Sequence, residues 1–156
     1  KSSLLAAITN ANPKIANYQF TTLNPNLGIA SYDNKEITIA DIPGLVEGAH
    51  KGIGLGTKFL KHIERCKSLL HLIDITNDDL KKSYKQIKDE LKNYSNKIAK
   101  KKELIVLNKI DLIDKKEKDK ILIDFSKNIK SEIITISTVE KKSVSKIKAK
   151  LISYAS

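Results

Sequence analysis

The sequence has little of what secreted and membrane proteins require. Its one cysteine, Cys66, excludes a disulfide within the chain, and a single cysteine is more often an inert buried thiol than a nucleophile. No apolar run approaches the roughly 18–20 residues that cross a membrane, and no stretch resembles a secretory signal. The 156 residues, of which 40% are hydrophobic, suffice for one compact domain, which we expect in the cytoplasm.

Negative charge is also scarce. The net charge is +11, and Arg65 is the only arginine, so lysine supplies nearly all the positive charge. A basic surface of this kind attracts nucleic-acid phosphates. The alternative is base composition, because lysine, isoleucine and asparagine, which AT-rich codons specify, are abundant together. The even spread of the lysines, with only five tyrosines and three phenylalanines for stacking, favours the compositional explanation.

Short apolar runs alternate with amphipathic ones along the chain. The predicted strands are residues 36–42, 68–75, 103–108 and 132–137, and three of them have the near-continuous apolar composition typical of strands buried on both faces. The predicted helices are residues 59–63, 80–98, the second half of 114–130, and 144–152. This alternation predicts an α/β fold with a mostly parallel sheet and helices on both faces. In such folds ligands bind at the carboxyl ends of the strands.

The chain begins with Lys1-Ser2-Ser3, followed by an apolar segment. Before a helix, this sequence fits the end of a phosphate loop, G-x-x-x-x-G-K-[ST]. There the lysine reaches the β- and γ-phosphates, the serine hydroxyl ligates Mg²⁺, and backbone N–H groups at the helix start face the anion. A Lys-Ser pair is common by chance, so the motif carries weight only together with others.

Asp41-Ile42-Pro43-Gly44 directly follows a predicted strand. A carboxylate at a strand end can hold a Mg²⁺-bound water, and a glycine three residues later lets a backbone N–H approach a γ-phosphate. The same pattern also fits a simple turn. Five of the six glycines lie at positions 44, 48, 52, 54 and 56, which indicates either an order–disorder switch or a loose surface loop.

Asn108-Lys109-Ile110-Asp111 is the most specific motif. The Asp111 carboxylate can accept hydrogen bonds from N1–H and the 2-amino group of guanine, neither of which adenine offers. The aliphatic part of Lys109 can pack over the base, and Asn108 can connect neighbouring loops. The alternative is a turn in which Asp111 starts a helix.

Ser137-Thr138-Val139 follows the last predicted strand, where a loop backbone could contact the guanine oxygen. His71 lies inside SLLHLIDI and is expected to be a sheet histidine rather than a ligand, and no grouping of residues suggests zinc.

Two further stretches resemble the Obg family of bacterial GTPases: YQFTTLNPNLG at 18–28 and DIPGLVEGAHKGIGLGTKFLKHIERC at 41–66. The resemblance extends over the whole chain. It implies a P-loop NTPase G domain that requires Mg²⁺, binds GTP and GDP, and hydrolyses GTP as a slow switch in assembly of the large ribosomal subunit. It also implies that residues 1–156 lack the first strand and the phosphate-loop glycines, which we expect upstream of Lys1. K⁺ is a further candidate cofactor.

The resemblance also assigns the candidate site. Catalytic roles fall to Lys1, Thr22 and Gly44, and the metal ligands would be Ser2, Thr22 and, through water, Asp41. The nucleotide would contact Lys1, Ser2 and Ser3 in the phosphate loop; Phe20, Thr21, Thr22, Leu23 and Asn24 in switch I; Asp41, Ile42, Pro43 and Gly44 in switch II; and Asn108, Lys109, Ile110, Asp111, Ser137, Thr138 and Val139 around the base.

The sequence departs from the family at Thr138, where alanine is usual, and lacks glycines common after that motif. Many GTPases place a water-orienting glutamine after D-x-x-G, whereas this chain has Leu45, which predicts slow intrinsic hydrolysis. We expect a monomer whose partners are guanine nucleotide and the large ribosomal subunit or its RNA. Two other hypotheses stay open: a nucleotide sensor without useful turnover, and a basic nucleic-acid-binding domain.

Overall fold

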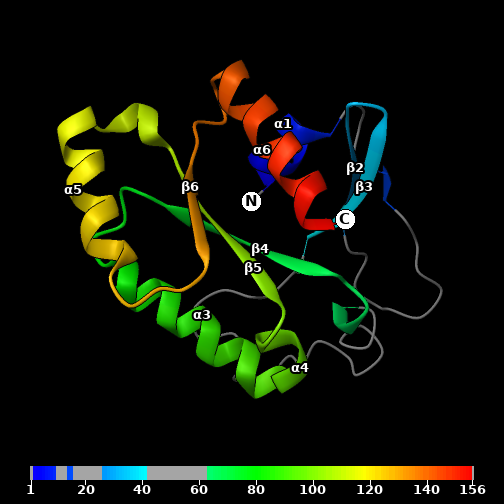
Figure 1. Cartoon of the computed structure of the whole chain (residues 1–156), viewed down its shortest axis with the longest axis horizontal. Helices are drawn as coiled ribbons and strands as arrows, with labels where there is room; N and C mark the ends of the chain where they lie inside the picture. The colour runs from blue at the N-terminus through cyan, green and yellow to red at the C-terminus, as the bar shows by residue number, and fades with distance from the viewer. Residues whose placement is uncertain (1, 10–13, 16–25, 42–62, 156) are drawn as a thin grey trace.

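The structure is a computed structural model that describes residues 2–9, 14–15, 26–41 and 63–155. Its helices and strands alternate along the chain, as the sequence predicts (Figure 1). In chain order they are α1 (Ser2–Ile8), β1 (Lys14–Ile15), β2 (Asn26–Tyr32), β3 (Lys35–Ala40), β4 (Ser68–Asp74), α3 (Leu80–Tyr94), α4 (Asn96–Ala99), β5 (Lys102–Asn108), a 3₁₀ helix (Ile110–Leu112), α5 (Lys115–Ser126), β6 (Glu132–Thr135) and α6 (Lys141–Ala155).

A parallel sheet with the order β4-β5-β6 forms the centre of the described structure. The central strand β5 contains four consecutive residues, Leu104 to Leu107, that are 0% exposed. Side chains of a strand alternate between the two faces of a sheet, so β5 must be covered on both faces. This confirms the prediction of a strand buried on both sides within an α/β fold.

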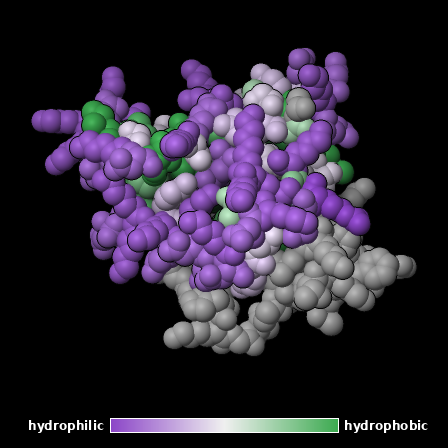
Figure 2. Space-filling view, turned by 60° about the horizontal axis from the view of Figure 1, so that its bottom comes forward, coloured by the Kyte–Doolittle hydropathy of each residue, from purple (hydrophilic) through white to green (hydrophobic). Residues whose placement is uncertain are grey.

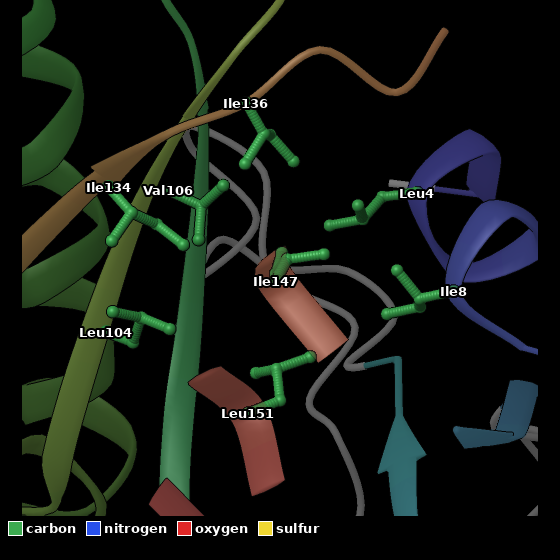
Figure 3. Close-up of a cluster of buried hydrophobic side chains, with 8 residues drawn as sticks. All are labelled: Leu4, Ile8, Leu104, Val106, Ile134, Ile136, Ile147 and Leu151. Atoms are coloured by element: carbon green, nitrogen blue, oxygen red, sulfur yellow. The ribbon is translucent and has the colours of Figure 1, made fainter. Parts of the chain in front are cut away.

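Helices cover both faces of this sheet (Figure 1). Helices α1 and α6 pack on one face, where eight side chains from α1, β5, β6 and α6 converge (Figure 3): Leu4, Ile8, Leu104, Val106, Ile134, Ile136, Ile147 and Leu151. Helices α3, α4 and α5 cover the other face around Leu91, Ile98, Ile105 and Phe125. Burying each such side chain contributes about 1.5–3 kcal/mol, and together they fix the orientation of the sheet.

Strands β2 and β3 form an antiparallel hairpin, and β1 adds a short third strand to it. The predicted strand at 36–42 corresponds to β3, whereas β2 has no counterpart among the predicted strands. The hairpin turn consists of Asp33 and Asn34, whose φ angles are 50° and 57°. Two central residues with positive φ are typical of a type I′ turn, which matches the twist of paired strands.

The hairpin and the parallel sheet do not pair with each other among the described strands. A cavity of about 810 Å³ has apolar side chains from β3, β4 and α1 in its wall. They include Ile37, Ile39, Leu70, Leu72 and Leu4. Strands β3 and β4 each pair on one side only with another described strand, so the described residues leave their other edges without a strand partner.

Capping residues account for where the helices differ from their predicted bounds. The predicted helix 80–98 is two helices, because Ser95 ends α3 and caps α4. Helix α5 begins earlier than predicted, since the Asp114 carboxylate accepts a hydrogen bond from Glu117 N at 2.8 Å. The predicted helix at 59–63 lies outside the described residues except for Ile63. Among the described helices, none is long and apolar enough to cross a membrane.

Candidate functional site

Backbone hydrogen bonds join the loops at the carboxyl ends of the three parallel strands. Ile75 N donates to Asn108 O at 3.0 Å, and Ile136 N donates to Leu107 O at 2.9 Å. Ile110 N donates to Ile136 O at 3.3 Å. Because the strands are parallel, these ends share one edge of the sheet, and the hydrogen bonds hold the loops in register there. The most specific sequence motif therefore lies on a rigid support.

Asn108 is the last residue of β5 and is only 9% exposed. Its Oδ1 atom is buried and has no hydrogen-bond partner among the described residues. An unpartnered buried acceptor costs about 1–3 kcal/mol, so this position fits a donor from a ligand or from another part of the chain. The prediction that Asn108 connects loops is consistent with this geometry and stays a prediction.

Lys109 adopts a left-handed backbone conformation with φ 70°, which is uncommon for a residue with a side chain and concentrates at functional sites. Its Nζ forms an ion pair with Asp74 Oδ2. Both side chains are half-exposed, so the pair contributes little to stability. The pair connects the N-K-x-D loop after β5 to the end of β4.

The structure brings Asp111 and Ser137 together across 26 positions of sequence. Ser137 Oγ donates to Asp111 Oδ1 at 2.6 Å, and Ser137 itself is 0% exposed. The Asp111 carboxylate remains exposed to solvent. The two sequence motifs thus form one site, in which a buried hydroxyl orients an accessible carboxylate. Val139, by contrast, is 77% exposed.

Asp74 at the end of β4 was not among the predicted site residues. Its Oδ1 accepts hydrogen bonds from Thr76 N at 3.0 Å and Thr76 Oγ1 at 2.7 Å. Burial by itself would raise the pKa of the Asp74 carboxyl, but the hydrogen bonds from Lys109 and Thr76 outweigh burial and lower the pKa. The signal in the sequence was an aspartate at the end of SLLHLID, the position that gives Asp41 its candidate role.

The phosphate side of the predicted site is described only in part. Helix α1 begins at Ser2, as a phosphate-loop lysine and serine before a helix require, and Asp41 directly follows β3 and is half-buried. Nine predicted residues lie outside the described part: Lys1, Phe20, Thr21, Thr22, Leu23, Asn24, Ile42, Pro43 and Gly44. Within the described part, no group of three or more histidine, cysteine or acidic residues could hold a metal ion.

Two residues with other expected roles are accounted for by the fold. His71 lies in the sheet, where its Nδ1 is 3.1 Å from Glu103 Oε1, so the prediction of a sheet histidine is confirmed. Cys66 is half-buried, and burial raises the pKa of its thiol against the opposing charge of Lys101. A protonated thiol is a poor nucleophile, as expected for an inert cysteine.

Comparison with known proteins identifies the family. Residues 1–109 match the family described as 50S ribosome-binding GTPase. The chain is 69% identical over all 156 residues to the GTPase Obg of Pelagibacter ubique, of which it covers 48%. It is 54% identical to the GTPase Obg of Ehrlichia canis over 137 residues, covering 88% of this chain and 40% of that protein. The chain belongs to the Obg family of P-loop GTPases.

Solved structures of other proteins share the fold of this Obg-family domain. The cytosolic domain of the T. maritima FeoB iron transporter in a GDP form has a TM-score of 0.69 at 19% identity, covering 99% of this chain and 58% of that chain. Translation elongation factor SelB from Methanococcus maripaludis, in complex with the GTP analogue GppNHp, has a TM-score of 0.63 at 15% identity, covering 99% and 30%. The Obg-family domain spans about half the length of the curated relatives it matches.

Proposed function

We propose that this domain binds guanine nucleotide with Mg²⁺ and hydrolyses GTP to GDP and phosphate as a slow molecular switch. The observation that carries the proposal is the hydrogen bond between Ser137 and Asp111 at the edge where Asn108 Oδ1 is buried without a partner among the described residues. A capped turn alone would leave no reason for a buried orphan acceptor at this edge. With nucleotide bound, we expect Asn108 Oδ1 to accept a hydrogen bond from the nucleotide or from a loop that the nucleotide orders.

Asp111 would select the base. Its carboxylate can accept two hydrogen bonds from the Watson–Crick edge of guanine, and Ser137 Oγ at 2.6 Å holds it in one orientation. Adenine would leave the carboxylate desolvated without donors, which costs several kcal/mol for a charged group. The left-handed turn at Lys109 would place the aliphatic part of that side chain over the base plane.

The phosphates would lie beside α1 and the end of β3. Lys1 would offset charge on the β- and γ-phosphates, and the Gly44 N–H would meet the γ-phosphate. Ser2, Thr22 and, through water, Asp41 present oxygen atoms, the ligands that Mg²⁺ prefers. Bound there, Mg²⁺ would neutralise charge on the phosphoryl group. The remaining nucleotide contacts are proposed for Ser3, the switch segments at 20–24 and 42–43, Ile110, and the backbone of Thr138 and Val139.

Leu45 makes the intrinsic reaction slow, because a leucine offers no hydrogen-bonding group to orient the attacking water. Backbone groups, a K⁺ ion or a partner would take over that task. The family description supports the large ribosomal subunit as that partner. We propose further that the protein is monomeric and cytoplasmic.

A strand that precedes Lys1 would fill the cavity between β3 and β4. The cavity is lined on both sides by apolar strand residues, and the free edges of β3 and β4 pair with no other described strand. Unpaired buried backbone groups are rare in native proteins, so an inserted strand would satisfy both sheets at once. In the full-length protein, amide hydrogens on the facing edges of β3 and β4 would exchange slowly; rapid exchange there would contradict the insertion.

Asp111→Asn in the full-length protein tests the proposed base recognition, with Asp114→Asn as the matched control. Both replace an exposed aspartate by its amide, and asparagine at 114 can still cap α5. Loss of two charge-assisted hydrogen bonds predicts GDP binding weaker by about 100-fold or more for Asp111→Asn and unchanged for Asp114→Asn, measured by calorimetry with Mg²⁺ present. Equal loss in both variants, or equal wild-type affinity for GTP and ATP, would contradict the proposal.

Phosphate release measured with and without large ribosomal subunits then separates an enzyme from a sensor. Release that accelerates with subunits supports the proposed switch. No release under either condition would leave nucleotide sensing as the function.

A further inference from the structure

The two ends of the parallel sheet carry opposite charge. Six exposed cations lie before or at the first residue of the three parallel strands: Arg65, Lys67, Lys100, Lys102, Lys127 and Lys130. We call this set the amino edge. At the carboxyl ends of the same strands, which we call the carboxyl edge, the loops 74–79, 108–114 and 136–140 hold six carboxylates and one lysine, Lys109. Lysines appear again where the next helices begin, at Lys115 in α5 and Lys141 in α6. The connecting loops at the two ends of the sheet therefore differ in charge.

The strand register places Lys67, Lys102 and Lys130, the cations nearest the strand starts, in one row. Ser68 pairs with Lys102, and Leu104 pairs with Glu132, so the segments before β4, β5 and β6 lie next to one another. Neighbouring strands are about 4.8 Å apart, and lysine side chains extend well beyond that spacing. Lys67 Nζ donates to Ala155 O at 2.8 Å, and Lys102 Nζ lies 4.1 Å from the Tyr154 ring centroid, which anchors the row to the end of α6.

Four carboxylates near the amino edge are engaged within the protein. Asp124 forms ion pairs with Lys81 and with Lys127 of the edge itself. Glu103 is buried and accepts hydrogen bonds from surrounding side chains. Glu64 accepts a hydrogen bond from Ser95 Oγ at 2.8 Å. Glu132 forms an ion pair with Lys150 and accepts a hydrogen bond from Tyr154. Within the described part of the chain, Lys100 and Lys130 form no ion pair, so the exposed potential at this edge is positive.

We infer that the amino edge binds the phosphate backbone of RNA. This inference rests on the proposed ribosomal partner. Lysine is a compact point charge that suits phosphates without reading sequence. Figure 2 turns the bottom of Figure 1, where α3 and α4 lie, toward the viewer. Most of the coloured surface in this view is hydrophilic. The carboxyl edge remains available to nucleotide while RNA is bound.

The chemistry of the amino edge favours RNA over a membrane or a protein. Membrane-binding surfaces combine lysine with exposed large apolar side chains, but of the exposed large apolar residues in the described part only Ile123, one turn of α5 before Lys127, is near the amino edge. The others are Ile29, Tyr32, Leu112 and Val139. Protein interfaces are depleted in lysine and enriched in aromatic residues and arginine, whereas this edge has one arginine, and its tyrosines, Tyr94 and Tyr154, are half-buried.

The test replaces Lys100, Lys102 and Lys130 of the full-length protein by glutamine together. The matched control replaces Lys115, Lys116 and Lys120 by glutamine; these are exposed lysines at the carboxyl-edge end of α5. Binding of a fluorescently labelled RNA duplex is measured over a range of salt concentrations. The slope of log K against log salt is negative, and each lost phosphate contact reduces its magnitude by about 1. We therefore expect the magnitude to decrease by roughly 2–3 for the amino-edge variant and by less than about 1 for the control.

Calorimetric GDP binding is measured on all three proteins. GDP affinity unchanged in both variants, with RNA binding weakened only at the amino edge, supports the inference. Equal weakening in the two variants, or a wild-type slope in the amino-edge variant, overturns it. The inference is also overturned if these lysines are needed to bind anionic phospholipid vesicles and the protein does not bind RNA through them. If the wild type binds RNA in this manner but no guanine nucleotide, the proposed GTPase function fails and the RNA surface stands.

Discussion

Glu103 lies at the centre of a buried polar cluster that we expect to dominate the acid stability of the domain. The carboxylate is 5% exposed. It accepts a hydrogen bond from Tyr84 Oη at 3.0 Å and forms ion pairs with Lys88 at 3.3 Å and, when the ring is protonated, His71 at 3.1 Å. Ser131 Oγ donates at 3.2 Å. The cluster joins β4, α3, β5 and the segment before β6 under one face of the sheet.

Burial by itself would raise the pKa of the Glu103 carboxyl, but the hydrogen bond from His71 and the charges of Lys88 and His71 outweigh burial and hold the pKa at about 2. A fall from the ordinary value of 4.5 to about 2 corresponds to roughly 3 kcal/mol of folding free energy. Because the folded pKa lies below the unfolded one, this stabilisation is complete above about pH 4.5 and disappears as the pH falls through about 2.

Glu103→Gln removes the charge and keeps the shape. We expect the free energy of unfolding at pH 7 to fall by roughly 2–3 kcal/mol, since Lys88 loses its buried partner. Urea unfolding of the full-length protein, followed from pH 7 to pH 2, measures this loss. The difference between wild type and variant should shrink as the pH falls below about 4.5. Glu132→Gln, at an exposed carboxylate paired with Lys150, is the matched control and should cost less than about 1 kcal/mol. A pH-independent difference, or equal losses in the two variants, would refute the reasoning.

Two further predictions concern α1 and the rate of hydrolysis. A Cβ atom at Gly28 would overlap the Thr9 methyl group and lie 3.0 Å from Leu5 Cδ1, so Gly28→Ala should destabilise the domain by about 1–3 kcal/mol. Adding Thr9→Ser to this variant removes the methyl group and should restore part of the lost stability, measured by thermal unfolding. If the second substitution restores no stability, the steric explanation is wrong. Single-turnover GTP hydrolysis without partners should be slow, because Leu45 cannot orient the attacking water, and a fast wild-type rate would disprove the role assigned to Leu45.

Local patterns in the sequence were enough to predict the elements that surround the site. The apolar runs predicted β4, β5 and β6, because strands buried on both faces leave long apolar segments. Strand β2 was missed, because Asn26–Tyr32 (NLGIASY) mixes glycine, serine and apolar residues and its identity as a strand depends on pairing with β3. Ser95 divided a continuous helical pattern, since its extended backbone and capping hydroxyl end one helix and start the next.

The sequence by itself determined the chemistry of this protein: the N-K-x-D motif, the strand-end carboxylates and the family, all of which depend on residue type and short spacing. Only the tertiary structure decided which distant residues meet. It placed Ser137 on Asp111, paired Lys109 with Asp74, and surrounded Glu103 with His71 and other partners from separate elements. It also gathered six exposed cations at the amino ends of the parallel strands. Those relations follow from the order and direction of parallel strands, which bring residues far apart in sequence to a common edge and which no short segment of sequence encodes.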